Sequence, residues 1–142
     1  MIHTIVASHG PLATALIASA TMVYGELPGV YSVTLDENAG IEGFKNEFAA
    51  TLACAQKHAD GVLVLCDMQS GTPWNVACHT AFSPQTTPPM AVIAGVNLPM
   101  LLQTDEIREM TDVHDAAGHL LSLTHPTLVI AAPVTLSPSD DF

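Results

Sequence analysis

A histidine and an aspartate occupy equivalent places in two separate segments of the sequence. His9 comes just after the apolar run IHTIVA (2–7), Asp67 directly follows the apolar run GVLVLC (61–66), and each precedes a small-residue loop that ends in a proline. A neutral imidazole accepts a phosphoryl group well at physiological pH, because its unperturbed pKa is about 6.5. A carboxylate that takes the N–H of one ring nitrogen leaves the other nitrogen free to attack. We therefore predict one phosphoryl-transfer site that contains both residues.

The loop that follows Asp67 has the composition of an anion-binding site. Ser70 and Gly71 allow the backbone to approach a ligand closely. Thr72 is predicted to cap the next helix, with Pro73 at its first position. The amides of such a loop, together with the positive end of the helix dipole, suit a phosphoryl group. We therefore predict that Ser70, Gly71 and Thr72 bind this group.

Other phosphate and metal chemistries have no support in the sequence. A Gly-x-x-x-x-Gly-Lys-Ser/Thr motif is absent and no lysine lies near either loop, so a P-loop kinase is not indicated. There is no Cys-x-x-Cys pair, and the spacing of His114 and His119 beside Asp112 and Asp115 is not a known ligand pattern. We predict neither a metal nor a cofactor.

Short apolar runs alternate with longer helical patterns along the chain. Strands are predicted over 2–7, 30–35, 61–66, 90–95 and 126–134. Helices are predicted over 11–25, 40–59, 73–82, 98–110 and 112–123. This alternation predicts an α/β fold, with a mainly parallel, doubly wound sheet and helices on both faces. The strand order 2-1-3-4 would place the first and third strands side by side and bring His9 to Asp67 at the carboxyl edge, where such sheets bind ligands.

Composition and charge limit the possible functions. The chain has 142 residues, of which 49% are apolar and 12% charged, enough for one core without disulfides. We predict a single domain over residues 1–134 and a flexible tail over 135–142. The formal net charge is −11, with Lys45, Lys57 and Arg108 as the only cations. This acidity argues against nucleic-acid binding and favours a basic protein partner.

The apolar pattern also predicts which side chains form the core. Cys54, Cys66 and Cys78 each sit in an apolar segment and are predicted to be buried free thiols in a reducing compartment. Trp74 either lies exposed beside the site, where it contacts a partner, or packs in the core. The helix over 40–59 has one apolar stripe, formed by Ile41, Phe44, Phe48, Leu52 and Ala55.

The first 25 residues contain no Lys, Arg, Asp or Glu, which raises the question of a targeting segment. A positive n-region is missing, and His9, Gly10 and Pro11 interrupt the apolar run well short of the roughly 20 residues that a membrane span needs. We therefore predict a buried strand followed by a helix, and a cytoplasmic protein.

Four stretches of the sequence resemble the enzyme IIA component (EIIA) of mannose-family sugar phosphotransferase systems (PTS; mannose, fructose and sorbose types). They occur in the family's order and spacing across about residues 1–110, and the remaining part matches weakly. The family often has a Gly-Gly pair where this chain has Ser70 and Gly71, a change that removes no necessary group. The stretches are SHGPLATALIASATMVYGE (8–26), DENAGIEGF (36–44), VLVLCDMQSGTPWNVA (62–77) and VIAGVNLPMLLQT (92–104).

The resemblance implies a cytoplasmic phosphocarrier. His9 would accept a phosphoryl group from the histidine phosphocarrier protein HPr and pass it to a histidine of a separate IIB protein. Asp67 maps onto the acid that pairs with the active histidine, and Gly71 and Thr72 map onto the phosphoryl-binding loop. The resemblance also implies association, through IIB, with membrane IIC and IID subunits. It implies a homodimer in which a C-terminal antiparallel strand, here 126–134, crosses to the partner's sheet.

Three other functions stay open at this stage. A regulatory phosphoprotein would use His9 in the same way but would control a partner by binding it. The phosphotransferase subunit of dihydroxyacetone kinase shares the fold and the Asp67–Met68 opening, yet does not usually continue as SGTPWN. A nucleotide or flavin binder of similar topology is disfavoured by the lack of cations at the loops.

Overall fold

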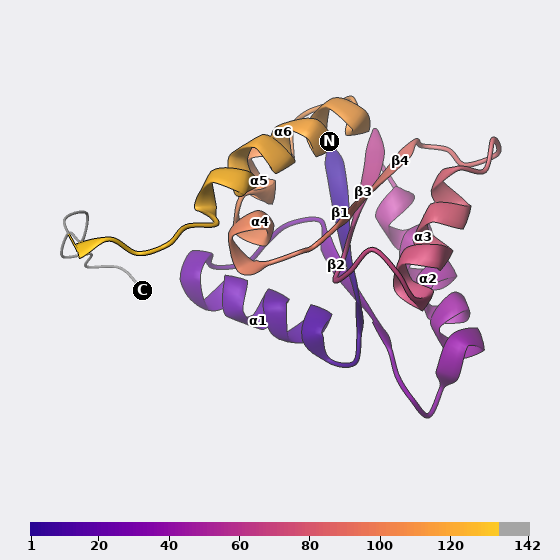
Figure 1. Ribbon diagram of the computed structural model, residues 1–142. Helices are drawn as coiled ribbons and strands as arrows, with labels where there is room; N and C mark the ends of the chain where they lie inside the picture. The colour runs from indigo at the N-terminus through magenta and orange to yellow at the C-terminus, as the bar shows by residue number, and fades with distance from the viewer. Residues whose placement is uncertain (134–142) are drawn as a thin grey trace.

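Four parallel strands form one sheet in the computed structural model, which describes residues 1–133 (Figure 1). The order is β2-β1-β3-β4, so the predicted α/β class and the order 2-1-3-4 are confirmed. This order puts β1 and β3 side by side, with Ala7 opposite Cys66. The strands are β1 (Ile2–His9), β2 (Val30–Leu35), β3 (Gly61–Cys66) and β4 (Met90–Ala94).

Helices cover both faces of the sheet, as Figure 1 shows. One face packs against α1 (Leu12–Tyr24), α4 (Leu98–Leu102), α5 (Thr104–Ile107) and α6 (Val113–Thr124). The other face packs against α2 (Gly40–Gln56) and α3 (Thr72–Ala81). No helix within residues 1–133 is long and apolar enough to cross a membrane.

Strand β3 lies at the centre of the core and is buried at every residue. Leu63 and Leu65 belong to the cluster under α1 and α6, whereas Val62 and Val64 belong to the cluster under α2 and α3. Successive side chains of a strand point to opposite faces, so a strand covered on both faces must be apolar throughout. The same arrangement places residue 67, the first after β3, at the carboxyl edge of the sheet.

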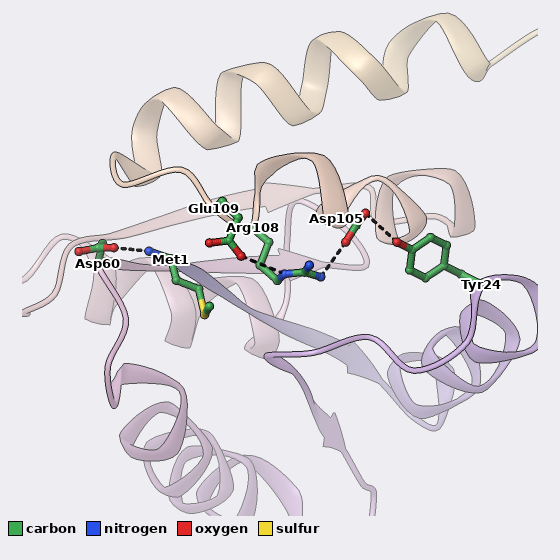
Figure 2. Close-up of polar contacts among 6 residues, drawn as sticks. All are labelled: Met1, Tyr24, Asp60, Asp105, Arg108 and Glu109. Atoms are coloured by element: carbon green, nitrogen blue, oxygen red, sulfur yellow. Dashed lines mark hydrogen bonds and ion pairs between the residues drawn. The ribbon is translucent and has the colours of Figure 1, made fainter.

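Polar contacts tie the end of α1 to α5 (Figure 2). The Tyr24 hydroxyl donates to Asp105 Oδ2 at 2.6 Å, and Arg108 Nη1 donates to Asp105 Oδ1 at 2.7 Å. Arg108 Nε also lies 3.6 Å from a Glu109 carboxylate oxygen. Asp105 therefore joins a helix from the first quarter of the chain to one from the last third.

The helix predicted over 98–110 is divided in two. Helix α4 ends at Leu102 and α5 begins at Thr104. The Thr104 hydroxyl donates to the Leu101 carbonyl at 2.7 Å. The backbone N–H of Gln103 donates to the carbonyls of both Pro99 and Met100. Such side-chain bonds compete with the regular helical ladder, which explains the interruption.

The strand predicted over 126–134 does not form in the described part of this chain. A 3-10 turn, η1 (His125–Thr127), is followed at 128–132 by chain without regular secondary structure, which leads away from the sheet (Figure 1). Val129 and Ile130 are 78% and 97% exposed. A strand needs a neighbouring strand to pair its backbone groups, and this segment lies beside none within residues 1–133. Residue 134 and the predicted tail, 135–142, lie outside the described residues.

Several predictions of burial are corrected by the structure. Cys66 is buried, but Cys78 is half-buried and Cys54 is exposed, because it lies on the side of α2 opposite to Leu52. Ile41, the first residue of the predicted stripe, is 54% exposed, whereas the other four stripe residues are buried. Trp74 is half-buried and packs against the cluster under α2 and α3, which agrees with the core alternative.

Candidate active site

The structure brings His9 and Asp67 into direct contact. His9 is the last residue of β1, and Asp67 follows β3, the neighbouring strand. Asp67 Oδ2 lies 2.9 Å from His9 Nδ1 and also accepts the backbone N–H of His9 at 2.9 Å. A carboxylate only accepts hydrogen bonds, so in the neutral ring the proton lies on Nδ1 and the lone pair on Nε2. One oxygen thus sets both the position of the main chain and the tautomer of the ring.

Exposure differs sharply between the two side chains. The His9 side chain is 42% exposed, whereas that of Asp67 is 12% exposed. Within the described residues, Asp67 Oδ1 is buried and has no hydrogen-bond partner. Both hydrogen bonds between the carboxylate and His9 are therefore made by Oδ2. The ring is therefore open to a reacting molecule, while the group that orients it is sheltered.

The backbone of Gly71 lies against the reactive edge of His9. A Cβ at residue 71 would lie 2.7 Å from His9 Nε2 and 2.8 Å from Cε1, closer than real Cβ atoms come. Gly71 also has φ +85°, a conformation that L side chains rarely adopt. Both facts favour glycine here, and together they place the backbone of this loop beside Nε2.

Ser70 and Thr72 flank Gly71 on this loop, Ser70 exposed and Thr72 half-buried. The predicted N-cap role of Thr72 is wrong. Thr72 is the first residue of α3, Gly71 occupies the cap position, and no side chain caps the helix. The left-handed backbone of Gly71 starts the helix one residue earlier than predicted, which moves Pro73 to the second helical position. The N-terminus of α3 still lies at the site, because the backbone of Gly71, whose carbonyl accepts the Asn75 N–H at 3.0 Å, lies against His9 Nε2.

Ser8 positions the site and was missed by the sequence analysis. Its buried hydroxyl accepts the Ala13 N–H at 2.8 Å and donates to the Gly10 carbonyl at 3.2 Å. These bonds hold the turn that carries His9 against the start of α1. The Gly10 N–H reaches across to the Leu35 carbonyl at 2.8 Å. The only signal in the sequence was a polar residue next to His9 at the end of an apolar run.

The cysteine beside Asp67 is not a competing nucleophile. Burial, with smaller contributions from the nearby Cys78 and Asp67, raises the pKa of the Cys66 thiol to about 12. Burial also raises the pKa of Cys78. Since the thiolate is the nucleophilic form, Cys66 stays inert at neutral pH.

The fold and the site together define a class of protein: a parallel α/β domain that presents a histidine–carboxylate pair beyond the carboxyl ends of two adjacent strands. The family model EIIA-man, described as the PTS system fructose IIA component, matches residues 3–121. The chain belongs to this family and is a PTS IIA component of the mannose family, a phosphotransferase component of sugar transport. This confirms the resemblance noted from the sequence.

Individual relatives agree with the family. The chain is 32% identical over 132 residues to the sorbose-specific EIIA component of Klebsiella pneumoniae, covering 92% of each. It is 29% identical to the fructose-specific EIIA component of Bacillus subtilis strain 168, covering 93% of this chain and 88% of the relative. Among solved structures, the mannose/sorbose specific IIA subunit from Enterococcus faecalis has a TM-score of 0.79 at 30% identity, covering 95% of this chain and 98% of that one.

Proposed function

We propose that this chain is a cytoplasmic phosphocarrier that accepts a phosphoryl group from phospho-HPr on His9 and transfers it to a IIB histidine in phosphoenolpyruvate-dependent sugar uptake. The contact between Asp67 Oδ2 and His9 Nδ1, at 2.9 Å, carries this proposal. In the neutral ring it leaves the lone pair on Nε2, and the His9 side chain is 42% exposed. Family membership supplies the donor and the acceptor.

The transfer exchanges one N–P bond for another. The lone pair of His9 Nε2 attacks the phosphorus of the donor's phosphohistidine, and the electron pair of the broken bond stays on the donor's ring nitrogen. The Nδ1 proton remains on His9. The ring becomes more positive as the new bond forms, and the Asp67 carboxylate stabilises that charge. In the second transfer, a ring nitrogen of the IIB histidine attacks the phosphorus. The N–P bond to His9 Nε2 breaks, and its electron pair returns to Nε2.

The phosphoryl oxygens would be held by the loop of Ser70, Gly71 and Thr72. Two observations support this role of the loop: the backbone of Gly71 approaches Nε2, and α3 begins at the next residue. Backbone amides at a helix N-terminus bind anions without a lysine or arginine. Such donors are fixed before the reaction, so they need no rearrangement when the charge develops.

The assembly follows the family. We propose a homodimer in which segment 126–134 crosses to the partner's sheet, and one domain over residues 1–134. The exposure of Val129 and Ile130 supports the exchange, because apolar side chains in an extended segment are stabilised by burial against a second surface. Through its IIB partner the protein would associate indirectly with the membrane IIC and IID subunits.

A phosphotransfer assay tests the proposal. The parent chain is incubated with phosphoenolpyruvate, enzyme I and HPr, and the product is analysed by intact mass and site mapping. We expect one acid-labile phosphoryl group on His9, absent from the His9→Ala variant. An unlabelled parent in a reaction where HPr itself is phosphorylated would overturn the proposal.

A further inference from the structure

A cleft of about 710 Å³ opens beside His9, between the turn after β1 and the loop from β2 to α2. Pro11, Leu35 and Ile41 contribute apolar surface to it. Leu35 pairs with His9 in the sheet register. The two residues that follow Leu35 are Asp36 and Glu37, which also line the cleft and are exposed. The reactive histidine therefore shares a cleft with two carboxylates.

The described residues that line this cleft include no Lys or Arg. A phosphoryl group on Nε2 would face backbone amides on the Gly71 side and two carboxylates on the cleft side. A small phosphorylated molecule entering here is repelled by Asp36 and Glu37. A protein whose surface carries Lys or Arg is attracted by the same two residues.

We propose that Asp36 and Glu37 are specificity-determining residues, which make His9 accept phosphoryl groups from a protein donor with a cationic face and reject small anionic phosphoryl donors. This inference rests on the proposed function of His9. The selectivity works by repulsion as well as attraction, since the same charges oppose one class of donor and favour the other. Ile41, apolar and 54% exposed at the cleft, offers the protein donor a contact that a small anion cannot use.

The charge of Asp36 can be removed without losing its structural role. Asp36 Oδ1 accepts the Asn38 N–H at 2.7 Å and so holds the loop in shape. Asparagine keeps an oxygen at the same place, so Asp36→Asn preserves this bond. Glu37→Gln changes an exposed side chain and keeps its size. The double variant therefore removes two negative charges from the cleft while retaining its geometry.

The test compares two donors on matched variants. The rate of His9 phosphorylation is measured with phospho-HPr and with phosphoramidate, a small anionic donor, at low ionic strength and at high salt. The control is Glu26→Gln/Glu109→Gln, which removes two charges at the opposite end of the sheet. Both of its side chains are exposed. Thermal unfolding of each variant verifies that it is folded.

For the double variant at low salt, we expect the HPr rate to fall about tenfold and the phosphoramidate rate to rise about threefold, with both changes shrinking at high salt. The control should change neither rate by more than about twofold, and Glu37→Gln alone should show roughly half of the logarithmic effect. Rates that move in the same direction, or a control that behaves like the double variant, would overturn the inference. A parent that takes no phosphoryl group from either donor would instead overturn the proposed function.

Discussion

The backbone of Gly71 lies so close to His9 that a Cβ at residue 71 would be 2.7 Å from Nε2. The nucleophilic nitrogen is therefore bounded on one side by a loop whose backbone, with φ +85° at residue 71, strongly favours glycine. On the other side of the ring, Asp67 holds Nδ1 at 2.9 Å. The two contacts come from one short segment, 67–71, so a single loop both orients the ring and approaches its reacting atom.

Gly71→Ala is expected to reduce His9 phosphorylation by about two orders of magnitude, since the added methyl group must displace either the ring or the loop. The matched control is Gly25→Ala. Gly25 has a similar backbone, with φ +98°, but a Cβ there would meet nothing within 4 Å. Both variants should lose about 1–2 kcal/mol of stability from backbone strain, and only the first should lose phosphorylation. Equal rates in the two variants would contradict this account.

Asp67→Ala should lower the rate of phosphorylation by roughly 10²–10⁴-fold, because it frees Nδ1 and removes the charge that stabilises the phosphorylated ring. Asp67→Asn keeps a side-chain acceptor without the charge, so its rate of phosphorylation should lie between those of Asp67→Ala and the parent. Single-turnover transfer from phospho-HPr measures both. Asp60→Asn, which removes a carboxylate paired with the amino terminus at the opposite edge of the sheet, serves as the control. A similar loss in that control would indicate a general effect of charge rather than a role for Asp67.

Ser8→Ala is expected to lower the free energy of unfolding by about 1–3 kcal/mol, because it leaves the Ala13 N–H buried without its acceptor. Urea unfolding with an unchanged slope would measure the loss. Ser19→Ala changes an exposed serine on α1, the helix that contains Ala13, and should stay within about 0.5 kcal/mol of the parent. A Ser8→Ala variant as stable as the parent would show that the hydroxyl does not hold the turn.

Tyr24 should make stability fall at alkaline pH. Its hydrogen bond to Asp105 raises the pKa of the Tyr24 hydroxyl above the ordinary value of 10.0, and the charge of Asp105 acts in the same direction. A folded-state pKa above the unfolded value means that this contribution is complete below about pH 10 and is lost as pH rises through the folded pKa. Tyr24→Phe should therefore show a weaker decline in unfolding midpoint above that pH than the parent. Tyr31→Phe, which keeps Tyr24, should decline like the parent.

The sequence by itself determined where the four strands of the sheet lie along the chain. The strands predicted over 30–35 and 61–66 have those bounds in the structure. An apolar run of that length between helical patterns is typical of a buried strand. The continuous apolar pattern of β3 further indicates that helices pack on both faces of the sheet there. Once the strands were assigned, a common order of parallel strands was enough to bring His9 to Asp67. This inference needed residue types and spacing only.

Tertiary structure decided the contacts that sequence patterns do not encode. The exposure of Ile41, the burial of the Ser8 hydroxyl and the approach of Gly71 to Nε2 each depend on where a segment distant in sequence comes to lie. The cap position of α3 is occupied by Gly71 and not, as predicted, by Thr72. The left-handed backbone of Gly71 begins the helix, and no side-chain hydroxyl caps it. Periodicity reports which face of an element is apolar, and it is set by neighbours along the chain. Distances between loops are set by the packing of whole elements, so only the folded chain determines them.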